Sequence, residues 1–480
     1  MIDLQQLDRL DFAGKHVTVV GLGVEGVDLI RYLSRRGAAV TVSDAKTPDR
    51  LADRLRDVEE LSVELRLGSN AAEAVSNSDA IFLSQSIPLD LEGLRAAREQ
   101  GTPLYSMVQL FLQLAPGPVV GITGSSGKTT TTALVAEMLR ADERPVFVGG
   151  NIGVGLLDQL DSVRPYTWSI LEISHTQLQL VDRSPHVAAV LNITPNHLDR
   201  FSWDDYRALK ANIIRYQAPG DIAVLGYDDP EARKLKPLVQ GRLIWFTMAG
   251  AVPGGYSQTG VVVRDGSAVL LSKGEETPLF DLAWLKLRGR HNQENAVAAA
   301  AIAIACGASP EAIACAVESF CGVPHRLELI GDADDVHYYN DSIATTPDRT
   351  VAGLRSFAEP VVLLLGGRDK HLPLQELARE ALAGCRAIVL FGESAAKLEV
   401  TIQSEKNDRR IPVVRVGRMA EAVAAAAGFA EAGDVVLLSP ACTSYDAYDN
   451  FERRGEHFRA LVQQMQTNPT GAKGVQSSHP

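Results

Sequence analysis

Short apolar runs alternate with segments of helical hydrophobic period along most of the chain. Each run is short enough to form one buried strand, and the segments between runs carry apolar residues at helical spacing. This alternation is typical of α/β domains built on largely parallel sheets, so we predict the α/β fold class. The runs lie at residues 16–20, 39–42, 80–83, 119–120, 169–171, 187–191, 361–365, 387–391, 412–416 and 434–438.

The chain of 480 residues is too long for one hydrophobic core and suggests about three domains of ~150 residues. We expect a Rossmann-like N-terminal domain at 1–106, a central α/β domain at 107–322 and a Rossmann-like C-terminal domain at 323–466. Residues 467–480 are polar, with Gly, Pro and Ser, and are expected to form a mobile tail.

Composition excludes several classes of protein. Hydrophobic residues make up 46% and charged residues 22%, which is the balance of a soluble globular protein. The apolar runs are too short to span a bilayer, and the net charge of −12 argues against broad binding to nucleic acid or anionic membrane. The 5 cysteines show no C-x-x-C spacing, so neither a disulfide framework nor a zinc site is indicated. We expect a cytoplasmic monomer.

A glycine-rich segment at 121–130, Gly-Ile-Thr-Gly-Ser-Ser-Gly-Lys-Thr-Thr, follows an apolar run and enters a helical pattern. This context predicts a P-loop, because backbone N–H groups and the helix dipole converge on one spot where a phosphate fits. Lys128 is expected to reach the terminal phosphates and Thr129 to ligate Mg²⁺. Ile122 breaks the general P-loop spacing, so the loop is a shorter form, and an ordinary turn with a solvated lysine is the alternative.

A second glycine-rich segment lies near the N-terminus. Gly21, Gly23 and Gly26 form G-x-G-x-x-G between a strand and a helix, and Asp44 ends the next strand where a ribose hydroxyl is usually bound. This fingerprint predicts a site for a diphosphate beside a ribose. Either a nicotinamide dinucleotide or a UDP-sugar fits it.

Polar residues follow the apolar runs of the central part. Glu172 comes directly after one run and could hold Mg²⁺, and His197 lies in the segment after the next. A lone histidine is more often structural, but its neighbours favour a site role. Lys210 stands in a helical pattern, which by itself indicates a solvated lysine. Asn292 and Asn295 share one face of a helix by their spacing, ahead of an alanine-rich helix expected at 296–306.

Taken together, these segments resemble one family, the Mur ligases of peptidoglycan synthesis, from Gly21 to about Leu461. The shortened P-loop is the form that this family uses. The resemblance is carried by residues 123–130, 150–153, 171–174, 192–200, 289–295, 324–328, 340–342, 438–444 and 450–455.

The resemblance implies an ATP-dependent amide-bond ligase that adds D-glutamate to UDP-N-acetylmuramoyl-L-alanine through an acyl phosphate. Cations and metal ions would offset the negative charge between the anionic reactants. It also implies two Mg²⁺ sites held by Thr129, Glu172, His197 and Lys210. Lys210 would carry CO₂ as a carbamate, contrary to the solvated-lysine interpretation. Lys128, His197 and Lys210 would be the catalytic residues.

The family's binding residues carry over to this chain by motif. ATP would be bound by Gly124, Ser125, Ser126, Gly127, Lys128, Thr129, Thr130, Asn292, Asn295, Arg326 and Asp341. The UDP-substrate would be bound by Gly21, Gly23, Gly26, Asp44, Asn151 and His197. Glutamate would be bound by Thr345, Lys370, Ser444 and Phe451.

Three positions depart from the family's pattern. Ile343 stands where many relatives carry a lysine, residues 84–86 read Ser-Gln-Ser in place of Ser-Pro-Gly, and residues 195–196 replace a more usual acidic pair. Other functions remain open: an NAD-linked oxidoreductase, a P-loop switch protein, and a related Mur-type ligase with another acceptor, such as L-glutamate.

Overall fold

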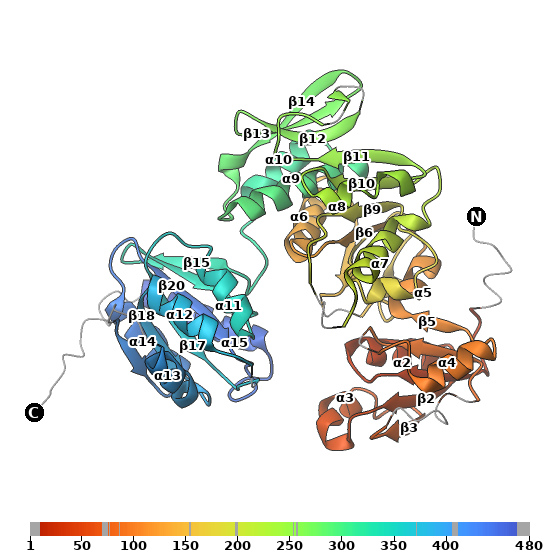
Figure 1. Ribbon diagram of the computed structural model, residues 1–480, viewed down its shortest axis with the longest axis horizontal. Coiled ribbons are helices and arrows are strands. Elements are labelled where there is room, and N and C mark those ends of the chain that lie inside the picture. Colours follow the sequence, from red (N-terminus) through yellow and green to blue (C-terminus); the bar gives the residue numbers. More distant parts are fainter. Residues whose placement is uncertain are drawn as a thin grey trace, which may run out of the picture. The chain divides into compact units, whose positions relative to one another are not determined.

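The computed structural model describes residues 10–69, 75, 77–85, 87–152, 155–196, 200–252, 254–255, 258–370, 372–405 and 411–467. By its internal contacts the chain divides into two compact units (Figure 1). Unit 1 comprises Met1–Leu285 and Arg290–Phe320, and unit 2 comprises Lys286–Gly289 and Cys321–Pro480.

The first sheet of unit 1 has the strand order β3-β2-β1-β4-β5, and all of its neighbouring strands run parallel. This is the order of a Rossmann fold, in which the chain reverses direction across the sheet between β1 and β4. Its elements are β1 (His16–Val20), α2 (Val24–Arg35), β2 (Ala39–Asp44), α3 (Ala52–Arg56), β3 (Val63–Leu67), β4 (Ala80–Leu83), α4 (Glu92–Glu99) and β5 (Leu104–Ser106).

Helix α5 (Met107–Leu114) connects this sheet to the next one. The Ser106 hydroxyl accepts the N–H of Gln109, and the Gln109 side chain accepts the N–H of Ser106, which completes a capping box. The capping pair explains why a helix begins directly after the strand.

The second sheet of unit 1 has the order β14-β13-β12-β11-β10-β9-β6-β8-β7. It is parallel from β7 to β12 and antiparallel from β12 to β14. Its strands are β6 (Val119–Thr123), β7 (Val146–Gly150), β8 (Trp168–Glu172), β9 (Val187–Val190), β10 (Ile222–Gly226), β11 (Arg242–Phe246), β12 (Thr259–Arg264), β13 (Ser267–Ser272) and β14 (Glu275–Asp281). Its helices are α6 (Lys128–Ala141), α7 (Trp203–Arg215), α8 (Pro230–Arg233), α9 (Arg290–Ala305) and α10 (Pro310–Ser319).

The sheet of unit 2 has the order β15-β16-β20-β17-β18-β19 and is parallel except for the β15–β16 pair. The part β19-β18-β17-β20 follows the 3-2-1-4 order of a Rossmann half. Its elements are β15 (Glu328–Ala333), β16 (Val336–Asn340), α11 (Pro347–Leu354), β17 (Val361–Gly366), α12 (Gln375–Gly384), β18 (Cys385–Phe391), α13 (Ala395–Ser404), β19 (Val413–Arg415), α14 (Met419–Phe429), β20 (Val435–Ala441) and α15 (Phe451–Thr467).

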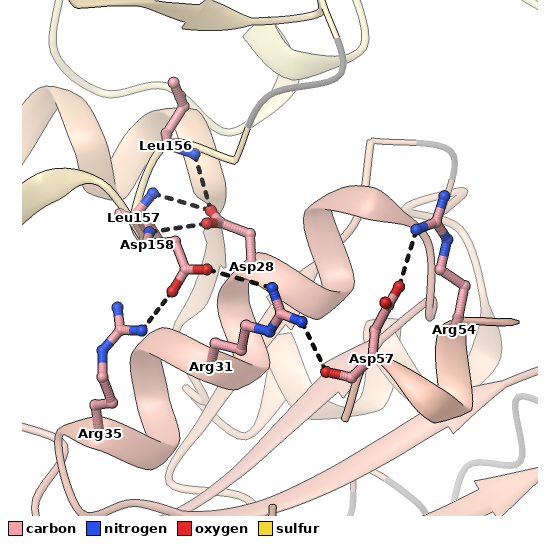
Figure 2. Close-up of polar contacts among 8 residues, drawn as sticks. All are labelled: Asp28, Arg31, Arg35, Arg54, Asp57, Leu156, Leu157 and Asp158. Carbon is pink, nitrogen blue, oxygen red and sulfur yellow. Dashed lines mark hydrogen bonds and ion pairs between the residues drawn. The ribbon is translucent and has the colours of Figure 1, made fainter. Parts of the chain in front are cut away.

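Within unit 1, Asp28 of α2 joins the first sheet to the segment that follows β7. Its carboxylate accepts the backbone N–H groups of Leu156, Leu157 and Asp158 at 3.1, 2.9 and 2.8 Å (Figure 2). Asp158 in turn forms ion pairs with Arg31 and Arg35, on the same helix as Asp28. Asp28 is 3% exposed, so these bonds replace its hydration almost entirely.

The α/β class is confirmed, with three separate and largely parallel sheets. The expected alanine-rich helix begins earlier than predicted, at Arg290 rather than Ala296, so both asparagines of its first part are helical. The domain boundaries stay a prediction. Of the expected tail, Thr467 ends α15 and residues 468–480 lie outside the described residues.

Candidate active site

The segments that the sequence singled out follow the carboxyl ends of parallel strands. The P-loop follows β6, and Glu172 ends β8, the neighbour of β6 in the sheet. In the ladder Glu172 pairs with Ile122, one residue before Thr123 at the end of β6. Ligands of open α/β sheets bind at this edge, so the sheet brings a phosphate loop and a carboxylate together where a ligand is expected.

The P-loop enters α6 through Gly127, which has a left-handed backbone with φ of 82°. A side chain at this position would be strained, and its Cβ would also lie 2.2 Å from Oδ1 of Asn295. Lys128 begins the helix and donates from Nζ to the carbonyl oxygen of Gly124 at 2.9 Å. The lysine therefore bends back over its own loop.

Asn192, directly after β9, holds the outer part of the P-loop. Its backbone carbonyl accepts the N–H of Ser125 at 3.0 Å, and its side-chain oxygen accepts the N–H of Ser126 at 2.9 Å. The Ser125 hydroxyl also donates to the carbonyl oxygen of Thr194 at 3.0 Å. The sequence indicated no role for Asn192 beyond its place in a motif. Asn192 follows β9, whereas the P-loop that it contacts follows the neighbouring strand β6.

Asn292 and Asn295 lie together in the first turns of α9, as predicted from their spacing. The Asn295 amide donates to Oδ1 of Asn292 at 3.2 Å. Asn295 is buried, and its side chain reaches the backbone of the P-loop at Gly127. The structure thus brings Asn295 to the P-loop within one unit.

Glu172 carries one buried oxygen without a protein partner. Its Oε1 accepts the Asn151 amide at 2.8 Å, whereas Oε2 is buried and has no hydrogen-bond partner. A buried carboxylate oxygen without a donor is unfavourable unless a cation or a water molecule contacts it. Carboxylate and hydroxyl oxygens suit Mg²⁺, so the residue types of Glu172 and of Thr129, the second residue of α6, fit a divalent cation.

Lys210, in the middle of α7, is 1% exposed, so the solvated-lysine interpretation was wrong. Its Nζ lies 5.0 Å from the centre of the Tyr206 ring. Burial and, to a smaller extent, the positive charge of Lys128 together lower the pKa of Lys210 to about 7. A buried amine with a pKa near neutrality can exist in the uncharged, nucleophilic form.

The N-terminal glycine loop is tightly built. Gly21 has φ of 96°, and a Cβ on Gly26 would lie 2.0 Å from the Gly21 carbonyl oxygen. Gly23 is the N-cap of α2. Asp44, predicted to meet a ribose hydroxyl, accepts the N–H of Leu22 at 2.7 Å and that of Lys46 at 2.8 Å. The carboxylate thereby fixes the glycine loop against the end of β2.

In unit 2, Asp341 follows β16 and is 4% exposed. It accepts the Ser439 hydroxyl at 2.7 Å and the N–H of Leu327 at 3.2 Å. Burial raises the pKa of Asp341 to about 7, although these bonds and the positive charge of Arg326 act in the opposite direction. The structure therefore places the two predicted residues Arg326 and Asp341 near each other.

The four residues predicted to bind glutamate lie on loops and a helix start of unit 2. Lys370, after β17, donates from Nζ to Oγ1 of Thr345, after β16, at 3.1 Å. Ser444 follows β20 and is buried, and Phe451 begins α15. The backbone bridge between Arg368 and Thr443 joins the loops after β17 and β20. Three strand-end loops thus meet around Lys370.

Arg454 is a buried cation that the sequence analysis left without a role. It is 0% exposed and donates to the carbonyl oxygens of Ser342, Gly366 and Cys442 at 2.8, 3.4 and 3.0 Å. Ser342 and Cys442 lie in the loops after β16 and β20, and Gly366 is the last residue of β17. Burial lowers the pKa of Arg454 to about 10. The sequence signal that could have indicated a role for Arg454 is its position one helical turn after Phe451.

Some predictions cannot be placed. His197 lies outside the described residues, as does Ser86 of the loop after β4. Among the residues that are described, no group of three or more His, Cys, Asp or Glu side chains could hold a metal ion. The same part of the chain contains no helix with the length and apolarity needed to span a bilayer.

Family models match three parts of the chain. Residues 15–106 match the MurD-like N-terminal domain of Mur ligases, 122–303 the Mur ligase middle domain and 325–442 the glutamate ligase domain of Mur ligases. A relative named UDP-N-acetylmuramoylalanine–D-glutamate ligase, from Symbiobacterium thermophilum, is 41% identical over 94% of this chain and 98% of its own. The protein of the same name from Koribacter versatilis is 36% identical over 95% and 99%.

Solved structures resemble the fold. UDP-N-acetylmuramate-alanine ligase MurC from Thermotoga maritima matches with a TM-score of 0.54 at 18% identity, covering 94% of this chain and 99% of that one. A UDP-N-acetylmuramoyl-L-alanyl-D-glutamate–2,6-diaminopimelate ligase matches with a TM-score of 0.54 at 17% identity, covering 95% and 94%. The matches to the three domain families and to full-length relatives agree with the strand-end placement of the motifs, and the protein is thus a ligase that belongs to the Mur ligase family.

Proposed function

We propose that this protein joins D-glutamate to UDP-N-acetylmuramoyl-L-alanine at the expense of ATP, in the synthesis of peptidoglycan precursors. The observation that carries the proposal is the 41% identity over 94% of the chain to a relative named for this reaction. The local geometry supports it, because the predicted residues form compact groups at strand ends in each unit.

The reaction has two bond-forming steps. An oxygen of the substrate's carboxylate attacks the γ-phosphorus of ATP, and ADP leaves with the bridging oxygen. The neutral amine of glutamate then attacks the carbonyl carbon of the acyl phosphate, phosphate leaves, and the nitrogen loses a proton. The first step turns a carboxylate, a poor electrophile, into an activated acyl group. The protein's task is to position two anionic reactants and offset their charge.

In this proposal the P-loop binds the phosphates of ATP. Lys128 would exchange its bond to the Gly124 carbonyl for the β- and γ-phosphates, and the start of α6 would direct backbone N–H groups at them. Asn292 and Asn295 would bind adenine, and Arg326 and Asp341 belong to the ATP-binding set by the same resemblance. Asn295 already contacts the P-loop, which supports its inclusion.

Mg²⁺ would be held by Thr129 and Glu172, with His197 and Lys210 as ligands of a second ion. The free oxygen of Glu172 supports the first site. Bound Mg²⁺ would withdraw charge from the phosphate oxygens. For the second site, burial of Lys210 and its lowered pKa favour the uncharged amine that adds CO₂ to form a carbamate. The carbamate would turn a cation into an oxygen ligand.

The substrate's uridine diphosphate would lie on the N-terminal loop of Gly21, Gly23 and Gly26, with Asn151 and His197 at the muramoyl part. The start of α2 supports this, since Gly23 leaves the first turn of the helix without a side-chain cap. The acceptor glutamate would meet Thr345, Lys370, Ser444 and Phe451. A cation beside a hydroxyl is the expected recognition of a carboxylate.

Phosphate release from ATP, measured with and without each substrate, tests the proposal. We expect release only when UDP-N-acetylmuramoyl-L-alanine and D-glutamate are both present, and the amide product should appear in equal amount. Release without an amine acceptor would favour a P-loop switch protein instead. Equal or greater release with L-glutamate would favour the alternative acceptor, and oxidation of a reduced nicotinamide would favour the oxidoreductase.

The carbamate has a test of its own. Lys210→Ala should lose most activity, and a short-chain carboxylic acid should restore part of it by supplying the missing oxygen ligand. The same acid should not restore Lys128→Ala, because that lysine contributes a cation. Full activity of Lys210→Ala without additive would exclude the carbamate.

A further inference from the structure

A tight turn after β16 is held by two cations from different elements. The carbonyl oxygen of Ile343 accepts the N–H of Thr345 at 2.8 Å, which closes the turn. Nη1 of Arg349, in the first turns of α11, donates to the same carbonyl at 3.3 Å. Lys370 donates to the Thr345 hydroxyl at 3.1 Å. Both cations therefore contact one segment of three residues.

Arg349 has donor capacity that the protein does not use. A guanidinium carries five N–H donors, and its contact with Ile343 engages a single, neutral oxygen. Within the described ranges no carboxylate lies in ion-pair contact with Arg349, and its side chain is exposed. Most other arginines of unit 2 with recorded side-chain contacts pair with a carboxylate, as Arg355 of the same region does with Glu376 and Glu380.

The charges of Arg349 and Lys370 act on each other. Burial lowers the pKa of the Lys370 ammonium, and the positive charge of Arg349 lowers it further. The same charge acts to lower the pKa of Asp341. Two cations that share a turn repel each other, even though the Asp348 carboxylate acts on Lys370 and the Asp341 carboxylate on Arg349, and a ligand with two negative groups would remove the repulsion that is left.

We propose that Arg349 is a second cation of the acceptor pocket and selects a dicarboxylic amino acid. Arg349 and Lys370 would each bind one carboxylate of the acceptor, on either side of the Ile343–Thr345 turn. The inference rests on the proposed function, since it takes the acceptor to be glutamate. Many relatives carry a lysine where this chain has Ile343, which contributes only its backbone carbonyl oxygen to the turn. Arg349 would supply the positive charge that Ile343 cannot.

The contrast between glutamate and glutamine isolates this role. The two acceptors have nearly the same shape and differ by one negative charge. An arginine that binds the second carboxylate must favour glutamate, whereas an arginine that only supports the turn treats both alike. The discriminating quantity is the ratio of kcat/KM for glutamate to that for glutamine.

The test uses the full-length enzyme and the phosphate-release assay with Arg349→Gln. The glutamine amide keeps a donor for the Ile343 carbonyl and removes the charge. We expect the glutamate KM to rise about 10- to 100-fold and the glutamate-to-glutamine ratio to fall by a similar factor, because a hydrogen bond between charged groups is lost. Arg349→Lys should recover part of the ratio. Arg355→Ala, which removes a paired arginine, should leave both quantities unchanged.

An unchanged glutamate KM and an unchanged ratio in Arg349→Gln would overturn the inference. So would a rise in KM for both acceptors by the same factor, because that is the result of a purely structural role. These outcomes are distinct from failure of the proposed function, in which the unaltered enzyme itself would release no phosphate with glutamate. Circular dichroism and thermal unfolding of Arg349→Gln establish that a loss does not come from misfolding.

Discussion

The ammonium nitrogen of Lys210 lies 5.0 Å from the centre of the Tyr206 ring, in a position where the lysine is 1% exposed. An ammonium buried against an aromatic ring keeps some cation–π attraction but loses its hydration. The loss dominates, because burial lowers the pKa of Lys210 from 10.5 to about 7. The folded protein therefore releases this proton at a lower pH than the unfolded chain does.

This difference predicts how stability changes with pH. Below pH 7 both states carry the proton, and the cost of burying the charge is fully present. Between about pH 7 and 10.5 the unfolded chain binds more protons, so the free energy of unfolding should rise with pH by up to ~1.4 kcal/mol per unit relative to Lys210→Met. Urea unfolding of both proteins at pH 7, 8 and 9 in bicarbonate-free buffer measures this. Parallel pH profiles would mean that Lys210 is not buried as a free amine.

Removal of the P-loop cation should abolish turnover. In Lys128→Ala the loop loses the ammonium that donates to Gly124, and the transferring phosphoryl group would lose the cation that the P-loop supplies. We expect phosphate release to fall on the order of 10²–10³-fold or more. Lys234→Ala, which removes an exposed lysine paired with Glu231, is the control and should retain activity. Activity of Lys128→Ala within a few-fold of the unaltered enzyme would contradict the role of the P-loop.

Substitution of Lys370 should act on the acceptor alone. Its ammonium donates to Thr345, and it lies among the loops of unit 2 that also carry Ser444. Lys370→Ala should raise the glutamate KM about 10- to 100-fold, since a hydrogen bond between charged groups is lost. Nucleotide binding, measured by calorimetry, should stay the same. If glutamate saturation is unchanged, the acceptor pocket has been placed wrongly.

Much of the strand pattern was predictable from the sequence because parallel strands buried on both faces are nearly continuous apolar runs. The run at 80–83 coincides with β4, and 361–365 with all but the last residue of β17. Strand β3 was missed because its outward positions are polar and exposed. Strands β13 and β14 of the antiparallel extension were also missed. The apolar run of β13, at 268–271, lies between turns of Gly and charged residues, and only Leu279 and Phe280 of β14 are buried.

Less of the site than of the fold could be predicted from the sequence. Motifs located Lys128 at the start of α6, Glu172 at the end of β8 and Asn295 in the first turns of α9. Burial of Lys210 was missed because lysine is rarely buried, although Tyr206, Ile213 and Ile214, which lie on the same face of α7, are apolar and buried. Arg454 joins the ends of three strands, through residues that are up to 112 positions away from it in sequence. Only the folded sheet brings such residues together.

The linkage through Asp28 predicts a large loss of stability on substitution. Burial raises the pKa of Asp28, whereas its bonds to the backbone of Leu157 and Asp158 lower it. Asp28→Ala would leave buried N–H groups of residues 156–158 without an acceptor (Figure 2). We expect a loss of about 3 kcal/mol or more in the free energy of unfolding. Thermal and urea unfolding measure it, and Arg36→Ala, which removes an exposed ion pair with Asp161, should cost less than about 1 kcal/mol.

Gly155 makes this prediction sharper, because its neighbour is the same carboxylate. A Cβ at Gly155 would lie 2.4 Å from Oδ1 of Asp28, so Gly155→Ala should push the carboxylate away from its three donors. In Asp28→Ala the carboxylate is gone, and of its atoms nearest to the added methyl group only the Cβ of residue 28 remains, at 3.1 Å. The loss of unfolding free energy in the double variant should therefore be smaller than the sum of the losses in the two single variants, by about 1 kcal/mol or more. Strict additivity in this double-mutant cycle would mean that Gly155 is required for a reason other than Asp28.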